Sequence, residues 1–278
     1  TVNTGEINIK FMKRCLDLAA KAEGLTYPNP LVGAVIVNNG FIIGEGYHVR
    51  SGEPHAEVIA IKSVVDRSKL PLSTLYVNLE PCSHFGKTPP CADLIIYEGI
   101  KKVIIGIIDP NELVAGKGVQ KLKSAGCEVI TGVLENEARL LNRRFFTFHE
   151  KKRPYIILKW AQSDDGFIDF KREKSNKPGP NWITGKPEKV LVHKWRASEQ
   201  AILAGGNTIR TDDPMLSVRE WSGKDPVRVI LTGSGNISNE SAIFKLNGTN
   251  IVFTYNSNVF YQNTDVVILN KAESTASQ

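Results

Sequence analysis

Four residues in the first third of the chain have side chains suited to metal-assisted hydrolysis: His55, Glu57, Cys82 and Cys91. Zinc takes imidazole and thiolate ligands at about 2.0–2.3 Å, and a catalytic zinc site keeps three protein ligands and one open position. One histidine and two cysteines would therefore fill three corners of a tetrahedron and leave the fourth for water. Because zinc lowers the pKa of bound water to about 7, these residues predict a site that supplies hydroxide at neutral pH.

Glu57 lies two residues after His55, so on a regular helix the two side chains would point about 200° apart. They can serve one site only at the N-terminal end of a helix, and Pro54 indicates that end. We therefore expect Glu57 to be a carboxylate that moves a proton between water and substrate, not a ligand. His84, two residues past Cys82, is an alternative ligand that would close the site as a structural one.

The elements that must position these residues alternate between helix and strand. Apolar periodicity predicts helices over 8–23, 55–65, 91–98, 119–125 and 135–146, and strands over 31–37, 41–46, 74–79, 102–108 and 127–132. Asn38-Asn39-Gly40 predicts a hairpin between the first two strands. The predicted ligands thus fall where strands end and helices begin, and helix N-termini stabilise thiolates. Cys15 and Cys127 lie on apolar faces and are predicted to be core residues.

A polar, charged stretch over 149–154 precedes a second α/β pattern, so we expect two domains, 1–150 and 151–278. In the second domain a helix is predicted over 184–197, capped by Thr184, with strands over 155–160, 200–204, 227–231, 251–254 and 266–269. A length of 278 residues, with 41% hydrophobic and 23% charged residues, suits two globular domains.

The overall charge and hydropathy exclude several classes of protein. No apolar run approaches the roughly 18 residues of a membrane span, and the N-terminus has no secretory signal pattern, so a soluble cytoplasmic protein is expected. Lys plus Arg number 35 against 29 Asp plus Glu, which gives a net charge of +6 without any basic arm. This mild excess suits an anionic small molecule, and we expect neither a nucleic-acid nor a membrane partner.

The segment from Glu80 to Asp93, with eight residues between its two cysteines, closely resembles the deaminase domain of the bacterial bifunctional riboflavin-biosynthesis family. Segments 27–34, 44–48 and 109–118 support the resemblance, which covers almost all of 8–150. It implies a three-layer, cytidine-deaminase-like α/β domain. It also implies that Zn²⁺ is held by His55, Cys82 and Cys91, that Glu57 is catalytic, and that the substrate contacts are Asn29, His48, Lys87 and Asn111.

The second half resembles the reductase domain of the same family, a dihydrofolate-reductase-like α/β domain that uses NADPH; the matching segments are 158–166, 182–185 and 204–214. The resemblance implies NADPH contacts at Ala161, Trp182, Thr208 and Asp212, and substrate contacts at Arg196, Leu216 and Arg219. Pro180 stands where the family usually has a serine. The glycine-rich segment that closes over the cofactor in the family is not found, so we expect a C-terminally incomplete, truncated reductase domain.

The reaction that the resemblance implies is zinc-dependent, hydrolytic deamination of 2,5-diamino-6-(5-phosphoribosylamino)pyrimidin-4(3H)-one. NADPH-dependent reduction of the ribosyl group of 5-amino-6-(5-phosphoribosylamino)uracil would follow, in a homo-oligomer that is a dimer or a tetramer. Three alternatives stay open: a deaminase with an impaired reductase domain, an RNA-editing nucleobase deaminase, and a non-catalytic structural zinc module. RNA-editing relatives usually separate their cysteines by two residues and need a basic, aromatic-lined groove.

Overall fold

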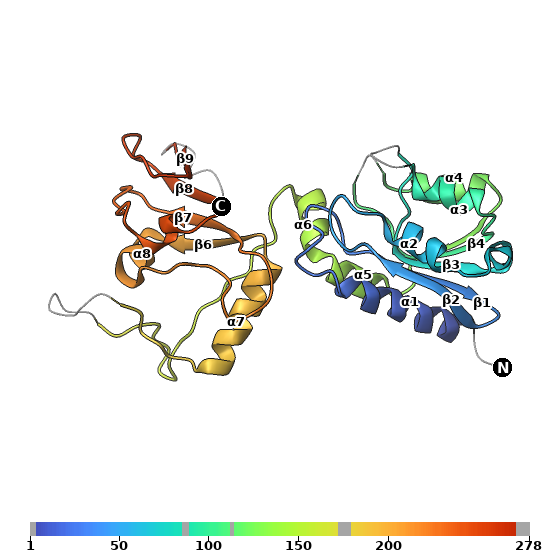
Figure 1. Ribbon diagram of the computed structural model, residues 1–278, viewed down its shortest axis with the longest axis horizontal. Helices are drawn as coiled ribbons and strands as arrows, with labels where there is room; N and C mark the ends of the chain where they lie inside the picture. The colour runs from blue at the N-terminus through green and yellow to red at the C-terminus, as the bar shows by residue number, and fades with distance from the viewer. Residues whose placement is uncertain (1–3, 85–88, 112–113, 172–178, 271–278) are drawn as a thin grey trace. The chain divides into compact units, whose positions relative to one another are not determined.

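The computed structural model of the chain describes residues 4–84, 89–111, 114–171 and 179–270 (Figure 1). The chain divides into two compact units, Thr1–Ile157 and Leu158–Gln278. This division lies after the predicted boundary at 150, and helix α6 (Arg143–Lys151) extends into the polar stretch over 149–154. Across the described ranges, no helix has both the length and the apolar character that crossing a membrane requires.

The first unit is built on a five-stranded sheet in the order β2-β1-β3-β4-β5. Its strands are β1 (Gly33–Asn38), β2 (Phe41–Tyr47), β3 (Thr74–Leu79), β4 (Lys102–Ile107) and β5 (Glu128–Thr131). β1 pairs antiparallel with β2 and β3, whereas β3, β4 and β5 are parallel. The predicted hairpin is confirmed: Asn39 and Gly40 both have positive φ angles, of 48° and 80°, as a tight turn of this kind requires.

Helices cover both faces of this sheet and make three layers (Figure 1). The helices are α1 (Thr4–Ala20), α2 (Ala56–Ser63), α3 (Cys91–Tyr97), α4 (Lys117–Ser124), α5 (Glu135–Leu141) and α6, with a 3₁₀ helix η1 (Arg67–Leu72). On one face α2, α3 and α4 bury an apolar core against β1, β3 and β4. On the other, α1 packs Met12 and Cys15 against Val35 and Tyr76. The central strands β1, β3 and β4 are mostly apolar and buried because both of their faces are covered.

The second unit contains a four-stranded parallel sheet in the order β6-β7-β8-β9. Its elements are α7 (Lys186–Ser198), β6 (Ala201–Gly205), α8 (Gly206–Asp212), β7 (Val227–Leu231), η2 (Ala242–Lys245), β8 (Asn250–Thr254) and β9 (Thr264–Ile268). Helix α8 lies between β6 and β7, and η2 between β7 and β8. Parallel strands in this sequential order follow from the alternating apolar pattern.

Three sequence predictions about elements are wrong. Residues 155–160 form no strand, because no described strand pairs with them, and Leu158 is 79% exposed. The helix predicted over 135–146 is two helices, α5 and α6, separated at Asn142. Helix α7 is capped at Gly185 instead of Thr184, because the Glu188 carboxylate accepts a hydrogen bond from the Gly185 N–H at 3.1 Å. Helix α8 was not predicted, since the pair Gly205-Gly206 is typical of a turn.

Two buried asparagines fix the chain just before β1. The Asn142 amide accepts from the Leu31 N–H at 2.7 Å and donates to the Leu31 carbonyl at 2.9 Å. The Asn78 amide donates to the same carbonyl at 3.0 Å and accepts from the Gly33 N–H at 2.7 Å. A loop that enters a core must have its backbone groups satisfied. These two side chains therefore take the place of water for the segment that follows Asn29.

We expect Asn142→Ala to lower the free energy of unfolding by about 1–3 kcal/mol, because it leaves the buried Leu31 N–H without an acceptor. Urea denaturation of the two proteins measures this difference. Asn38→Ala is the matched control, since its amide donates to the Leu72 carbonyl at the surface, and it should change stability by less than about 0.5 kcal/mol. Equal effects of the two substitutions would contradict the proposed importance of the buried bonds.

Candidate metal centre and anion site

The ligand atoms of His55, Cys82 and Cys91 all lie within 4.8 Å of one another. The His55 Nδ1 is 3.2 Å from the Cys91 Sγ and 3.6 Å from the Cys82 Sγ. In a tetrahedral zinc site with ligands at about 2.0–2.3 Å, neighbouring donor atoms are separated by about 3.3–3.8 Å. Three donors of the types that zinc prefers are thus already near the spacing that the metal requires.

Local structure explains why these three residues meet. Cys82 follows the end of β3, His55 is the N-cap of α2, and Cys91 is the first residue of α3. The backbone N–H of Cys91 donates to the Cys82 Sγ at 3.3 Å, as expected at a helix N-terminus, where the first N–H groups lack partners within the helix. The carboxyl end of one strand and the N-termini of two helices therefore build the site.

The two thiols are neighbours, but their pKa values are shifted in opposite directions. Hydrogen bonding from Cys91, and then from His55, lowers the pKa of Cys82 to about 4. Hydrogen bonding to Cys82, followed by burial, raises the pKa of Cys91 far above its usual range. The bond with Cys82 in turn raises the pKa of His55. The metal-free cluster therefore holds a thiolate at Cys82, and a bound cation would take over the role of the protons.

Glu57 lies beside the cluster and is not one of the three grouped ligands. It is the second residue of α2, and only 3% of its surface is exposed. Burial, with a further contribution from Cys82, raises the pKa of Glu57 to about 7. His55 and Glu57 face one site because His55, with φ −71° and ψ 161°, is extended and not helical. A carboxyl with this pKa can both accept and donate a proton at neutral pH.

Two of the predicted substrate contacts lie next to this cluster. The Asn29 Nδ2 is 3.0 Å from the His48 Nε2, and the His48 ring stands edge-on to the His55 ring with centroids 5.7 Å apart. The Pro54 carbonyl is 3.1 Å from the His48 Nδ1, so we assign the ring proton to Nδ1 and the acceptor role to Nε2. Burial lowers the pKa of His48, which favours this neutral form.

The remaining predicted residues of the first unit differ in their placement. Lys87 lies outside the described residues. Asn111 follows β4, and its backbone N–H donates to the Asp109 carboxylate at 2.8 Å. His84 is exposed and is not among the grouped ligands. Cys15 and Cys127 are buried in the two cores, as predicted.

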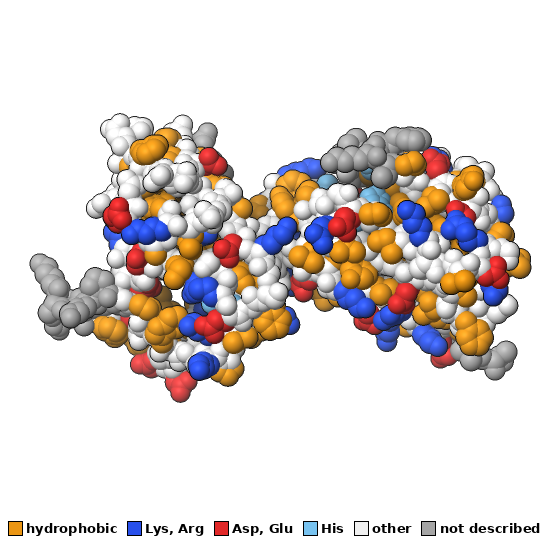
Figure 2. Space-filling model, viewed as in Figure 1, with side chains coloured by type: hydrophobic (Ala, Val, Ile, Leu, Met, Phe, Trp, Pro, Cys, Tyr) orange, Lys and Arg blue, Asp and Glu red, His pale blue; other side chains and the backbone are white. Residues whose placement is uncertain are grey.

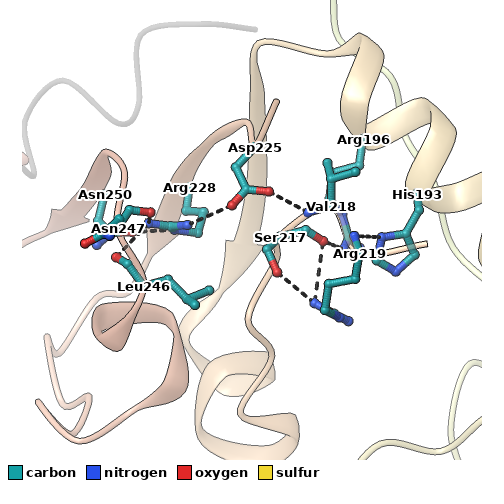
Figure 3. A network of polar contacts seen from close by, with 10 residues as sticks. All are labelled: His193, Arg196, Ser217, Val218, Arg219, Asp225, Arg228, Leu246, Asn247 and Asn250. Carbon is teal, nitrogen blue, oxygen red and sulfur yellow. Dashed lines mark hydrogen bonds and ion pairs between the residues drawn. The ribbon is translucent and has the colours of Figure 1, made fainter. Parts of the chain in front are cut away.

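In the second unit, Arg196 and Arg219 converge on one short segment (Figure 3). The Arg196 Nη1 donates to the Ser217 carbonyl at 2.6 Å, and the Arg219 Nη1 donates to the Ser217 hydroxyl at 2.9 Å. Burial, and then the Arg219 guanidinium, lowers the pKa of Arg196. The Arg196 Nε is buried without a hydrogen-bond partner among the described residues. Two close cations with spare donors fit an anion such as a phosphate.

Neighbouring side chains hold the backbone of this segment in place. The Asp225 carboxylate accepts from the Val218 N–H at 2.6 Å, and the His193 Nδ1 accepts from the Arg219 N–H at 3.0 Å (Figure 3). Leu216, a predicted substrate contact, precedes them with a left-handed φ of 53° and is buried. The predicted substrate contacts of the second unit thus lie together.

The four predicted NADPH contacts are not among the residues that line the two hollows described in the second unit. Thr208 and Asp212 are on α8, which contributes to a hollow at the carboxyl ends of β6 and β7 lined by Gly205, Gly206, Asn207, Arg210, Leu231, Thr232, Gly233 and Ser234. Another hollow is lined by Ser163, Asp165, Phe167, Asp169, Phe170, Lys171, Asn181 and Ile183. Ala161 and Trp182 are near these residues in the sequence but do not line the hollow. Carboxyl ends of parallel strands are common nucleotide sites.

Sequence reasoning missed three residues that support these sites: Glu80, Asn142 and His193. Glu80 carried a local signal, because it directly precedes the Pro81-Cys82 turn. His193 also carried one, because it lies one helical turn before Arg196 on α7. Asn142 had no local signal, since its partner Leu31 is 111 positions away.

Comparison with known proteins gives two family matches. Residues 6–107 match the family described as the cytidine and deoxycytidylate deaminase zinc-binding region, and this range includes His55, Glu57, Cys82 and Cys91. Residues 154–271 match the RibD C-terminal domain. The two matches confirm the predicted fold class, a cytidine-deaminase-like α/β domain followed by a dihydrofolate-reductase-like one.

Individual relatives agree with these matches. The chain is 50% identical over 227 residues to riboflavin biosynthesis protein RibD of Aquifex aeolicus, and 40% identical over 242 residues to that of Escherichia coli. It spans 62% and 64% of the length of those proteins. A solved Thermotoga maritima structure, a diaminohydroxyphosphoribosylaminopyrimidine deaminase/5-amino-6-(5-phosphoribosylamino)uracil reductase, is 43% identical, with a TM-score of 0.88 over 98% of this chain and 77% of that one.

The metal-free protein should be alkylated by iodoacetamide first at Cys82, because the low pKa of this thiol keeps it ionised at about pH 6, where an ordinary thiol is protonated. Peptide mass spectrometry locates the label. Cys15 and Cys127 are internal controls, since burial raises the pKa of both thiols. One equivalent of zinc should protect Cys82, and labelling that is the same with and without zinc would exclude Cys82 as a ligand.

Proposed function

The chain belongs to the RibD family of riboflavin-biosynthesis proteins, and from this premise we propose that it catalyses two successive reactions. The first unit deaminates 2,5-diamino-6-(5-phosphoribosylamino)pyrimidin-4(3H)-one by hydrolysis. The second unit takes part in the NADPH-dependent reduction of the ribosyl group of 5-amino-6-(5-phosphoribosylamino)uracil. Both substrates are phosphorylated pyrimidines, in keeping with the mild positive charge of the chain.

The observation that carries this proposal is the cluster of one imidazole and two thiols beside a buried carboxyl group. Three ligands with the right donor types and spacing fit zinc and leave one coordination position for water. A structural zinc site would need a fourth ligand, and His84 is exposed and outside the group. The open site and the nearby acid together favour hydrolysis over a structural role.

The chain's own residues account for the proton transfers of a deamination. Bound zinc would supply an activated water for attack on the ring carbon that bears the amino group. The Glu57 carboxylate takes the proton from that water and delivers it to the departing amine, which needs a pKa near neutrality. Asn29 and His48 offer amide and imidazole groups that can hydrogen bond to a pyrimidine edge beside His55. Lys87 and Asn111 complete the proposed substrate contacts.

The reductase part of the proposal is supported by the arginine pair and by the hollow next to α8. Arg196 and Arg219 would hold the ribose phosphate, with Leu216 beside them. Thr208 and Asp212 would contact NADPH at the carboxyl ends of β6 and β7. We also propose that the chain acts in the cytoplasm and forms a dimer or a tetramer. Among the described residues β6 is an edge strand of its sheet, and an edge strand can pair with a second copy.

A second candidate function is deamination without reduction. Two observations favour it. Residues 155–160, which carry part of the reductase resemblance, form no strand. The four predicted NADPH contacts are not among the residues that line the two hollows of the second unit. An RNA-editing role has less support. On the visible face of the first unit, Lys and Arg side chains are interspersed with Asp and Glu (Figure 2), whereas an RNA groove is basic and lined by aromatic side chains.

Glu57→Gln should reduce ammonia release by at least about 10²-fold, because the amide cannot carry the proton. The zinc content should stay near that of the wild type, since Glu57 is not one of the grouped ligands. Ammonia release and zinc content are measured on the same preparation. Glu45→Gln, which removes a surface partner of Arg14, is the control. A Glu57→Gln enzyme as fast as the wild type would remove the proposed proton carrier.

Arg196→Met should raise the KM for the deaminated, phosphorylated intermediate by about tenfold or more, because it removes a charged hydrogen-bond donor. NADPH consumption measures the reduction, and ammonia release, which should not change, is followed in parallel. Lys245→Met, in a surface ion pair with Glu240, is the control. A wild-type chain that releases ammonia but consumes no NADPH would favour the second candidate.

A further inference from the structure

A buried carboxylate that belongs to neither the metal cluster nor the proposed substrate contacts lies directly beside the metal-ligand turn. Glu80 follows the last residue of β3 and precedes Pro81-Cys82, and only 4% of its surface is exposed. Its backbone N–H donates to the Ile107 carbonyl at 3.0 Å, which extends the pairing of β3 with β4. Glu80 thus lies where two parallel strands end side by side.

Three backbone N–H groups from one segment converge on this carboxylate. The Oε2 atom accepts from Asp109 at 3.2 Å and from Gly116 at 2.9 Å. The Oε1 atom accepts from Val119 at 3.0 Å. A buried carboxylate is costly unless it is hydrogen-bonded, and charge-assisted bonds of this kind are stronger than neutral ones. Both oxygens are therefore used to hold the stretch between β4 and α4.

The same stretch packs directly against the turn that carries Cys82. A Cβ atom at Gly118 would lie 2.1 Å from the Pro81 carbonyl oxygen and 3.1 Å from the Glu80 Oε1, so only glycine allows this approach. At the other end of the stretch, the Asp109 carboxylate accepts from the Asn111 N–H at 2.8 Å. A continuous series of contacts therefore joins the Cys82 turn, through Glu80 and Asp109, to Asn111.

We propose that Glu80 is a positioning residue for the deamination: its carboxylate fixes residues 109–111 and 114–119 against the Cys82 turn and so places Asn111 for the substrate. This inference rests on the proposed function, in which Asn111 contacts the pyrimidine. Glu80 itself touches neither metal nor substrate in this role. It acts through backbone bonds that a carboxylate can make and an amide of the same shape cannot.

Glu80→Gln tests the proposal, because its –NH₂ group must face at least one of the three N–H donors in place of an acceptor oxygen. Hydrogen exchange of the metal-loaded protein should become at least about tenfold faster at the amide of Gly116 or at that of Val119, whichever faces the –NH₂ group and so loses its acceptor. Exchange in the β3 and β4 cores should stay unchanged. Unaltered exchange at both amides would overturn the proposal, whatever the activity of the chain.

Kinetics gives the second readout. With the phosphoribosyl diaminopyrimidine, Glu80→Gln should raise KM by about tenfold or more, with kcat and zinc content close to the wild type. Glu45→Gln, which removes a surface carboxylate elsewhere in the unit, should leave all three unchanged. Loss of zinc together with activity, or an unchanged KM, would contradict a role in placing Asn111. An inactive wild-type chain would count against the proposed deamination, and the exchange result would still decide the role of Glu80.

Gly118→Ala provides an independent variant if Glu80→Gln does not fold. It keeps the carboxylate but pushes the stretch away from Pro81, because the new methyl group cannot lie 2.1 Å from a carbonyl oxygen. It should speed exchange at Gly116 and Val119 and raise KM by a similar factor. Wild-type values of both in Gly118→Ala would show that the contact with the Cys82 turn does not position the stretch.

Discussion

Two sulfur atoms and one imidazole nitrogen are held within 4.8 Å of one another, and this crowding of ionisable donors governs the chemistry of the first unit. The hydrogen bonds among these groups change their proton affinities. The pKa of Cys82 falls, and the pKa of Cys91 rises. Metal binding to such a cluster releases the protons that its thiol and imidazole groups share, so a divalent cation can replace them. The fold creates it by ending β3 where α2 and α3 begin.

The same edge of the sheet explains the properties of Glu57. Glu57 is the second residue of α2, between the core residues Ala56 and Ala60. Burial removes water from its carboxyl group, so the pKa of Glu57 rises toward neutrality. An exposed glutamate would stay ionised and would be a poor proton donor. Burial beside the cluster thus converts an ordinary acid into a group that can work in both directions, and the extended N-cap His55 lets both side chains face one point.

The sequence was informative where the determinants are local. Pro54 and the Pro81-Cys82 turn predicted the ligands and Glu57, and Asn39-Gly40 predicted the hairpin. Local patterns failed where distant residues decide: the apolar run over 155–160 has the composition of a strand but no described strand pairs with it. Asn142 interrupts a helix because its side chain serves Leu31, far away in the sequence. The periodicity of apolar residues does not predict such hydrogen bonds between a side chain and a distant backbone group.

X-ray absorption at the zinc edge, on purified protein with its metal content measured, tests the open three-ligand centre most directly. We predict one zinc per chain, coordinated by two sulfur atoms, one imidazole nitrogen and one light oxygen atom at about 2.0–2.3 Å. The oxygen ligand should be a water molecule that exchanges with solvent. A chain that binds no zinc, or a zinc ion closed by a second imidazole, would contradict a hydrolytic centre built from His55, Cys82 and Cys91.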